Sequence, residues 1–218
     1  MRAPKACCIF IPKGFGIYQR NGDKNFYVSV LTADAMKKIA GFDAPEFALI
    51  EKAVLATLKK ALPTAKITLT QPALPPEAPL LTRYVKPTDS ANWESDKGGT
   101  EMLVEEGLKP YGFILSNFTD YNLYVNEDVS PSPFDFYDTY SICKLKVINT
   151  VANTRPEAGT FAPCSLMIYK VKGSNEIVMG FPSVYNWISS AHITDPDGKE
   201  ALLQAQKDFE EVLKSVTE

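Results

Sequence analysis

The sequence predicts an α+β fold in which antiparallel sheets are backed by helices and two related units follow each other along the chain. The first observation is an internal repeat: Phe10–Ala40 realigns on Phe161–Ala191 at a constant offset of 151, which is Tyr169 minus Tyr18. The second is a glycine turn at the same place in each copy, and the third is an amphipathic helix that closes each copy. A repeat of this kind indicates the architecture before any local signal does.

The first copy is expected to form a hairpin followed by two helices. Asn21-Gly22-Asp23 is a strong turn signal between strands expected over 8–19 and 25–31. A short helix is expected from Thr32 to Ala40, and a longer one should follow it.

The longer helix is indicated by Asp43 and Pro45, which are typical of an N-cap and a first-turn proline. It should end near Leu62, because Pro63 follows. Its apolar residues step by three and four, which predicts one stripe that faces a core. The stripe consists of Phe47, Ile50, Val54, Leu58 and Leu62.

Residues 64–99 are expected to be a tether, because prolines crowd this part of the chain and it ends at Gly98-Gly99. Two of its pieces, Lys66–Thr70 and Leu80–Val85, have the residue types of strands. Since prolines restrict such pieces to sheet edges or extended linkers, the tether could lend one strand to a sheet.

The second copy is expected to be complete over residues 100–218. Strands are expected over 112–118, 136–148 (with Lys144 and Lys146 on one face), 161–172 and 176–181. Residues 119–133 should be a surface loop. Helices are expected over 101–109, over 183–191 and, after a turn at Asp195–Gly198, through Leu202 to Val216.

Composition argues against several classes of protein. The chain has 218 residues and a net charge of −3, so it lacks the basic surface that nucleic-acid binding needs. No apolar run approaches the roughly 20 residues that span a bilayer. The four cysteines match no zinc spacing, and no cofactor or metal site is assigned. The compartment stays open: periplasmic if an upstream signal has been lost, and otherwise cytoplasmic.

The segment Phe161-Ala-Pro-Cys-Ser-Leu-Met-Ile-Tyr169, followed by a glycine turn, a strand, a proline and a helix, resembles the DUF302 family. Gly112-Phe113-Ile114 resembles the strand after that family's first helix. Tyr140–Lys144 resembles the strand before a later Asn-Pro helix, although Lys-Leu-Lys replaces Asn-Pro here. The resemblance covers about 100–216 and, through the repeat, about 4–62.

This resemblance implies a curved antiparallel sheet backed by helices, association in pairs, and no common activity. It divides the chain into an incomplete first unit (1–63), the proline-rich tether (64–99) and a complete second unit (100–218). An incomplete unit would leave an open sheet edge and an uncovered apolar face. We therefore expect tether strands, self-association, a partner chain or upstream residues to complete it.

An apolar space bordered by tyrosine and tryptophan is the candidate ligand site, because the chain holds 10 Tyr and 12 Phe. The candidate residues for binding an apolar small molecule are Tyr140, Tyr169, Tyr185, Trp187 and His192. The alternative for the helix that carries Trp187 is ordinary core packing. A further acidic and aromatic cluster could line a pocket, hold calcium or form a solvated strand edge: Glu127, Asp128, Asp135 and Asp138.

Reactive groups are few, and no residue is assigned as catalytic. His192 is the single histidine and could be a general base or an exposed loop residue. Cys164 could be a reactive thiol if a cation lowers its pKa, or a small buried hydrophobe. Cys7-Cys8 could bind a soft metal such as Cu(I). The sequence has no nucleophile elbow, Walker loop or His-Glu-x-x-His motif.

These observations favour a non-catalytic small-molecule-binding or assembly protein. The alternative is an enzyme, or a redox or metal accessory protein, that uses Cys164 or His192.

Overall fold

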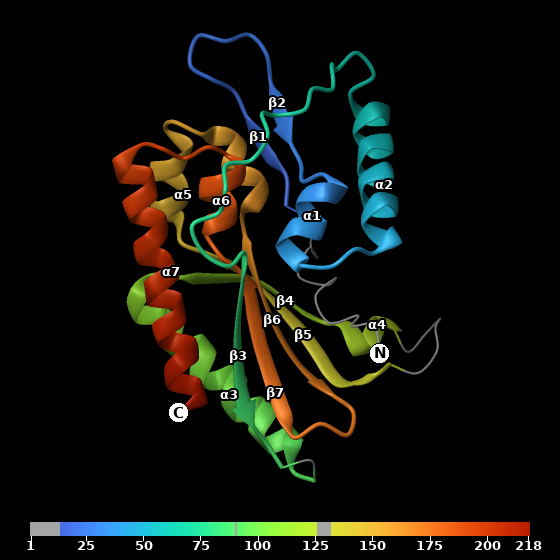
Figure 1. Ribbon diagram of the computed structural model, residues 1–218, viewed down its shortest axis with the longest axis vertical. Coiled ribbons are helices and arrows are strands. Elements are labelled where there is room, and N and C mark those ends of the chain that lie inside the picture. The colour runs from blue at the N-terminus through green and yellow to red at the C-terminus, as the bar shows by residue number, and fades with distance from the viewer. Residues whose placement is uncertain (1–13, 90, 126–131) are drawn as a thin grey trace.

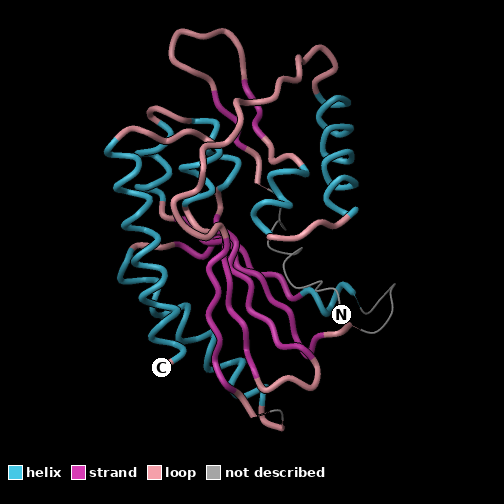
Figure 2. The backbone as a smooth tube through the Cα atoms, viewed as in Figure 1, coloured by secondary structure: helices cyan, strands magenta, loops and turns pink. Residues whose placement is uncertain are grey.

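The computed structural model describes residues 14–89, 91–125 and 132–218, and its fold is α+β with antiparallel sheets (Figures 1 and 2). The strands are β1 (Gly16–Tyr18), β2 (Tyr27–Ser29), β3 (Leu81–Pro87), β4 (Ile114–Asp120), β5 (Phe134–Cys143), β6 (Cys164–Val171) and β7 (Glu176–Pro182). The α-helices are α1 (Ala33–Ala40), α2 (Pro45–Ala61), α3 (Trp93–Leu108), α4 (Tyr121–Val125), α5 (Leu145–Ala152), α6 (Tyr185–Ser190) and α7 (Pro196–Thr217). Two 3₁₀ helices are η2 (Lys109–Tyr111) and η3 (Pro156–Phe161).

The main sheet has the strand order β3-β7-β6-β5-β4, and all neighbouring strands are antiparallel. Its edge strand β3 comes from the proline-rich segment and pairs with β7, from Leu81 opposite Pro182 to Pro87 opposite Glu176. The tether therefore does lend a strand, and the sheet includes residues before the expected boundary at 100. An edge position suits β3 because Pro87 has no N–H to donate.

Helices α3 and α7 cover one face of this sheet (Figure 1). Val104 and Leu108 of α3 and Phe209 and Leu213 of α7 are buried against strand residues of β5, β6 and β7. Phe181 of β7 lies against Phe209, with ring centroids 4.2 Å apart. This layer holds a large apolar core of the molecule.

The opposite face carries a second core that includes α1. Tyr137 of β5 and Tyr169 of β6 stack with ring centroids 5.2 Å apart, in the same cluster as Met36 of α1. The small hairpin β1–β2 is a separate sheet that lies against η3, and Ser29 Oγ donates a hydrogen bond to the Glu157 backbone oxygen at 2.8 Å. The hairpin, α1 and α2 occupy the upper part of Figure 1.

The first unit confirms some local predictions and corrects others. Thr32 caps α1, because its Oγ1 accepts a hydrogen bond from Ala35 N at 3.2 Å. Asp43 does not cap α2; its carboxylate lies 3.1 Å from Lys37 Nζ, and Ala44 occupies the cap position. The strand expected over 8–19 is described from residue 14 onward, and the remainder lies outside the described residues.

The predicted core stripe of α2 is only partly covered, with Ile50, Val54 and Leu58 half-buried. Phe47 is its buried residue, whereas Leu62 at the far end is 44% exposed. A 17-residue helix of this kind normally depends on packing of its apolar face for stability. Within the described residues, the covering layer expected for this stripe is therefore incomplete along α2 and missing at its end.

Two helix starts differ from the prediction. α3 begins at Trp93 and runs through Gly98 and Gly99, because Trp93 stacks on Phe136 with ring centroids 5.6 Å apart. Such packing outweighs the roughly 1 kcal/mol that each helical glycine costs. The supposed turn at 195–198 is the first turn of α7, where Asp195 Oδ1 accepts from Gly198 N at 2.7 Å.

The strand expected over 136–148 ends at Cys143, and α5 follows. Lys144 and Lys146 therefore do not share a strand face: Lys144 Nζ pairs with Asp208 at 2.6 Å, and Lys146 is exposed. Val147 and Val151 point to the core at helical spacing. The loop expected over 119–133 contains the end of β4 and α4, and residues 126–131 lie outside the described part.

Within the described ranges, no helix is both long and apolar enough to cross a bilayer.

Candidate functional site

The predicted ligand-binding residues lie in three separate places. Tyr140 packs under α3, and Tyr169 lies on the other face of the sheet beside Tyr137. Tyr185 and Trp187 are on α6, in a third cluster with α5 and the first half of α7. The structure does not bring these aromatic side chains together around one space. Trp187 packs as core, with its ring stacked on that of Phe161 at 5.7 Å.

A small apolar cavity lies in this third cluster, and Trp187, Cys143 and Cys164 are among the residues that line it. Its volume is ≈ 30 Å³. Pockets for small molecules usually measure about 300–1,000 Å³, whereas a cavity of this size holds one or two waters. Burial, and then the neighbouring Cys143, raise the pKa of the Cys164 thiol to about 12. A nucleophilic thiol needs the opposite shift, so Cys164 has the chemistry of a half-buried apolar side chain.

His192 lies just after α6 in the left-handed region, with φ of 53°. Its Nε2 is 2.8 Å from the Pro72 backbone oxygen. Nearby, Leu74 N donates to Ser189 O at 2.9 Å, and Lys199 pairs with Glu77 at 2.7 Å. His192 therefore helps to fix the proline-rich segment onto the second unit, rather than facing Asp195, whose carboxylate accepts from Thr154 Oγ1 and Gly198 N.

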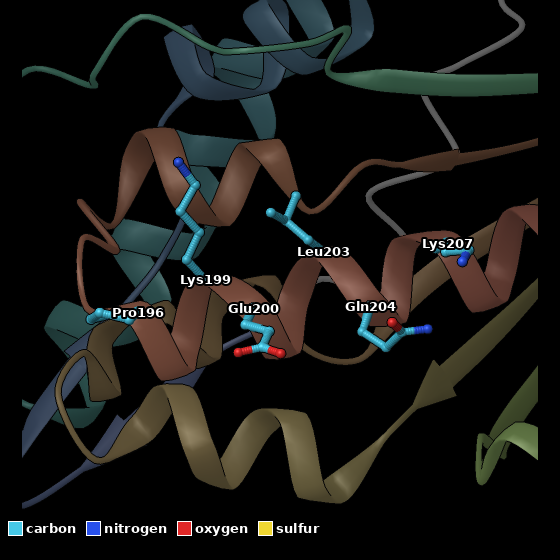
Figure 3. Close-up of a pocket in the computed structure, with 6 residues that line it drawn as sticks. All are labelled: Pro196, Lys199, Glu200, Leu203, Gln204 and Lys207. Carbon is cyan, nitrogen blue, oxygen red and sulfur yellow. The ribbon is translucent and has the colours of Figure 1, made fainter.

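A wider depression of ≈ 430 Å³ follows the outer side of α7. Its lining residues step along that helix: Pro196, Lys199, Glu200, Leu203, Gln204 and Lys207. Figure 3 shows that Lys199 and Leu203 project to one side of the helix and Glu200 and Gln204 to the other. Because these groups diverge, they do not define a position for a bound molecule.

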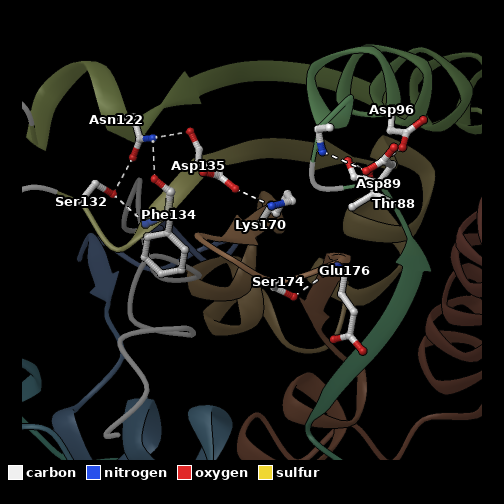
Figure 4. A network of polar contacts seen from close by, with 11 residues as sticks. Thr88, Asp89, Asp96, Asn122, Ser132, Phe134, Asp135, Lys170, Ser174 and Glu176 are labelled. Carbon is white, nitrogen blue, oxygen red and sulfur yellow. Dashed lines mark hydrogen bonds and ion pairs between the residues drawn. The ribbon is translucent and has the colours of Figure 1, made fainter.

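The predicted acidic and aromatic cluster is neutralised by lysines. Lys170 Nζ lies 2.5 Å from Asp135 Oδ2, and the Lys170 side chain is buried (Figure 4). Asn122 Nδ2 donates to the Asp135 backbone oxygen at 2.9 Å and so fixes this stretch of β5. Glu127 and Asp128 lie outside the described residues, as do Cys7 and Cys8. Among the described residues, no group of three or more acidic, cysteine or histidine side chains could hold a metal ion.

The most unusual titratable cluster lies under α3. Lys97 and Glu101 are one helical turn apart on α3, and Asp138 of β5 is fully buried beneath them. Lys97 Nζ is 2.7 Å from Asp138 Oδ2 and 3.9 Å from Glu101 Oε1. Next to this cluster, Tyr140 OH donates to Glu105 Oε1 at 3.1 Å.

Burial raises the pKa of Glu101 to about 8, and its hydrogen bond to Asp138 adds to this shift. Burial also raises the pKa of Asp138. Near neutral pH Glu101 therefore keeps its proton and donates it to the Asp138 carboxylate. This pair can release a proton when the pH rises through about 8, but Asp138 has no exposed surface with which to contact a substrate.

Sequence reasoning did not identify Glu101 and Lys97 as part of this cluster. Their spacing of four residues on a helix is a usable signal for an ion pair. The third member, Asp138, comes from a distant strand, and only the placement of α3 over the sheet reveals it.

Comparisons with known proteins agree with the fold. No protein-family model matches the sequence. An "Uncharacterized protein" of Aquifex aeolicus (strain VF5) is 30% identical over 97 residues, which are 44% of this chain and 65% of that protein. The chain thus spans slightly less than two thirds of that relative's length.

The structure is also similar to the crystal structure of an uncharacterized conserved protein DUF302 from Bacillus stearothermophilus. The TM-score is 0.50 at 21% identity, and the match covers 65% of this chain and 100% of the other. A likeness at this identity shows the fold, so part of this chain has a DUF302-like structure. The resemblance inferred from the sequence is confirmed to that extent. That the chain contains two such units in tandem stays a prediction.

Proposed function

We propose that this protein is a non-catalytic binding or assembly protein. In this proposal, residues 14–62 are an incomplete copy of the hairpin and helices β6, β7, α6 and α7. Another protein chain covers the apolar faces that the incomplete copy leaves open.

The constant offset of 151 residues relates the two hairpins pair by pair, which supports a duplicated unit. Gly16 lies opposite Ser29 in the β1–β2 hairpin. Adding 151 to both numbers gives Met167 opposite Gly180, and this is the pairing found between β6 and β7. A shared register is a stringent form of similarity, because a slip of one residue would turn every side chain to the other face.

The backbone at the turns and helix ends supports the same offset. Gly22 and Gly173 both have left-handed backbone, with φ of 81° and 76°. Gly41 ends α1 with φ of 75°, and its counterpart His192 has φ of 53°. The proposed duplication accounts for the unusual backbone of His192, because a helix end of this type normally favours glycine. The two long helices also begin alike, with a proline as first residue: Pro45 in α2 and Pro196 in α7.

The single observation that carries the proposal is a difference in burial at matched positions. The exposed fraction is 71% at Ile17 against 0% at Ile168, 74% at Phe26 against 0% at Ile177, and 44% at Leu62 against 0% at Leu213. In the second unit these positions belong to the core under α3 and α7. In the first unit, within the described residues, no such layer covers them. Exposed apolar surface of this kind is typical of sites where another protein binds.

The other candidate functions have less support. A cavity of ≈ 30 Å³ is too small for an apolar ligand. The raised pKa of Cys164 and the backbone contact of His192 give no support to nucleophilic or general-base chemistry.

The test compares two equally exposed leucines on different units. Leu62→Lys lies at the end of the α2 stripe, and the matched control Leu103→Lys lies on α3; their side chains are 44% and 47% exposed. Neither change should destabilise the monomer by more than about 0.5 kcal/mol. We expect the wild type to migrate above 24.1 kDa, either when purified or in an extract of the cells that express it. Leu62→Lys should lose the larger species and Leu103→Lys should keep it. A wild type of 24.1 kDa under both conditions would refute the proposal.

A further inference from the structure

The second unit shows what would cover the open face of the first. Phe181 of β7 and Phe209 of α7 lie in contact there, with ring centroids 4.2 Å apart. Subtracting 151 from each number gives Val30 and Leu58. The face of the hairpin that carries Ile17, Val28 and Val30 should therefore pack against an α2 helix, as the β6–β7 face packs against α7.

The α2 helix of the same chain does not make this contact. It packs against α1 through Phe47 and Ile50, and it stands to one side of the β1–β2 hairpin (Figure 1). Glu51 Oε2 also accepts a hydrogen bond from Ala33 N at 3.2 Å, which ties α2 to the start of α1. If α2 turned back onto its own hairpin, these contacts would be lost.

In the part of the chain that the structure describes, two apolar faces are thus left open, and the duplicated unit indicates that they fit each other. The first is the hairpin face with the exposed Ile17 and Phe26, and the second is the later part of the α2 stripe, where Leu58 is half-buried and Leu62 is exposed. A second copy of the chain offers both faces again. It can satisfy both without moving α2 from α1, whereas closure within one chain cannot.

We propose that two copies of this chain form a symmetric dimer in which α2 of each copy covers the β1–β2 hairpin of the other. This inference rests on the proposed function and names the partner that it requires. The two contacts are identical and related by a twofold axis, so the assembly closes at two subunits and leaves no open face for further growth. The contact repeats between chains one that β7 and α7 make within a chain.

Cross-linking between variants that each carry one introduced cysteine tests the proposal directly. One full-length chain carries Val30→Cys and another, isotopically labelled, carries Leu58→Cys, both with Cys7→Ser and Cys8→Ser. The two are mixed, allowed to exchange and treated with a short bis-maleimide, and the products are identified by mass spectrometry. We expect a covalent heterodimer joined through residues 30 and 58. The control replaces Leu58→Cys with Leu145→Cys, an exposed position of the second unit, and should give no such product.

A chain that carries both Val30→Cys and Leu58→Cys distinguishes contact of α2 with the hairpin of another copy from contact with the hairpin of its own chain. Intermolecular products support the dimer, and a product linked within a single chain overturns it. If neither product forms and the mass of the protein is 24.1 kDa, the dimer is also overturned.

A charge substitution supplies a second measurement that does not depend on cross-linking. The Ile17 side chain is 71% exposed in the single chain, so a monomer with Ile17→Lys should fold normally. Placing the lysine under α2 of a second copy should raise the dissociation constant by on the order of a hundredfold. An unchanged constant would refute the dimer. If the purified chain is monomeric but runs larger in cell extract, the exchange of α2 is wrong while the proposed function stands.

Discussion

Glu101→Gln is predicted to stabilise the protein in a pH-dependent way. The pKa of Glu101 rises from its ordinary value of 4.5 to about 8 in the folded state. Because the folded state keeps a proton that the unfolded chain releases, the free energy of unfolding should fall as the pH rises from 4.5 to about 8 and then level off. At about 1.4 kcal/mol for each pH unit, the loss is roughly 3 kcal/mol at pH 7 and roughly 5 kcal/mol over the whole interval.

Glutamine has the same shape, can donate an amide hydrogen to Asp138 and has no proton to lose. Urea unfolding at a series of pH values should therefore show equal stability of Glu101→Gln and the wild type near pH 4.5, and a growing advantage of the variant up to about pH 8. Glu106→Gln, at an exposed position on the same helix, should follow the wild type throughout. A constant difference between Glu101→Gln and the wild type across this range would mean that Glu101 does not keep its proton in the folded state.

Three further predictions follow from the second unit and the helix ends. Lys97→Met should lower the free energy of unfolding by roughly 3–5 kcal/mol in urea, because it leaves the buried carboxylate of Asp138 without its cation; a loss below 1 kcal/mol would contradict this. Peptide-level mass spectrometry after iodoacetamide treatment at pH 8 should find Cys164 almost unlabelled in the folded protein, since its pKa is about 12, and rapid labelling would show the burial to be wrong. In thermal unfolding, Gly98→Ala should stabilise the protein by about 0.5–1 kcal/mol because Gly98 lies inside α3, and Gly41→Ala should destabilise it by about 1 kcal/mol because Gly41 has left-handed backbone. An added Cβ meets nothing within 4 Å at either site, so backbone conformation alone should set the opposite signs. Two effects of the same sign would contradict this prediction.

Local chemistry predicted the elements whose signals are confined to a few residues. The turn glycines Gly22 and Gly173 and the N-cap Thr32 have the roles that their types indicate. β3 was foreseen as a strand that the tether could lend, because the sequence Leu80–Val85 suits an edge.

The errors arise where tertiary contacts outweigh local preference. Gly98 and Gly99 argue against a helix, but stacking of Trp93 on Phe136 extends α3 through them. The β-branched run after Cys143 suits a strand and a helix equally, and packing of Val147 selects α5. The α2 stripe was correctly read as apolar, but the core expected over it buries Phe47 and, among the described residues, leaves Leu62 exposed.

The candidate site residues were hard to predict for a similar reason. The spacing of apolar residues around Tyr140, Tyr169 and Trp187 indicates that these side chains are buried. It does not indicate that each one belongs to a different core cluster. The pairing of Glu101 with Asp138 depends on where α3 crosses β5, which no spacing along the chain encodes.

Hydrogen–deuterium exchange of the intact protein at low and high concentration tests most directly whether another chain covers the first unit. In the proposed dimer, amides of residues 26–30 and of the second half of α2 should exchange at least tenfold more slowly at high concentration, while amides of β6 and β7 do not change. Equal exchange at both concentrations, with a mass of 24.1 kDa throughout, would mean that these apolar faces stay open to water and that no second copy completes the unit.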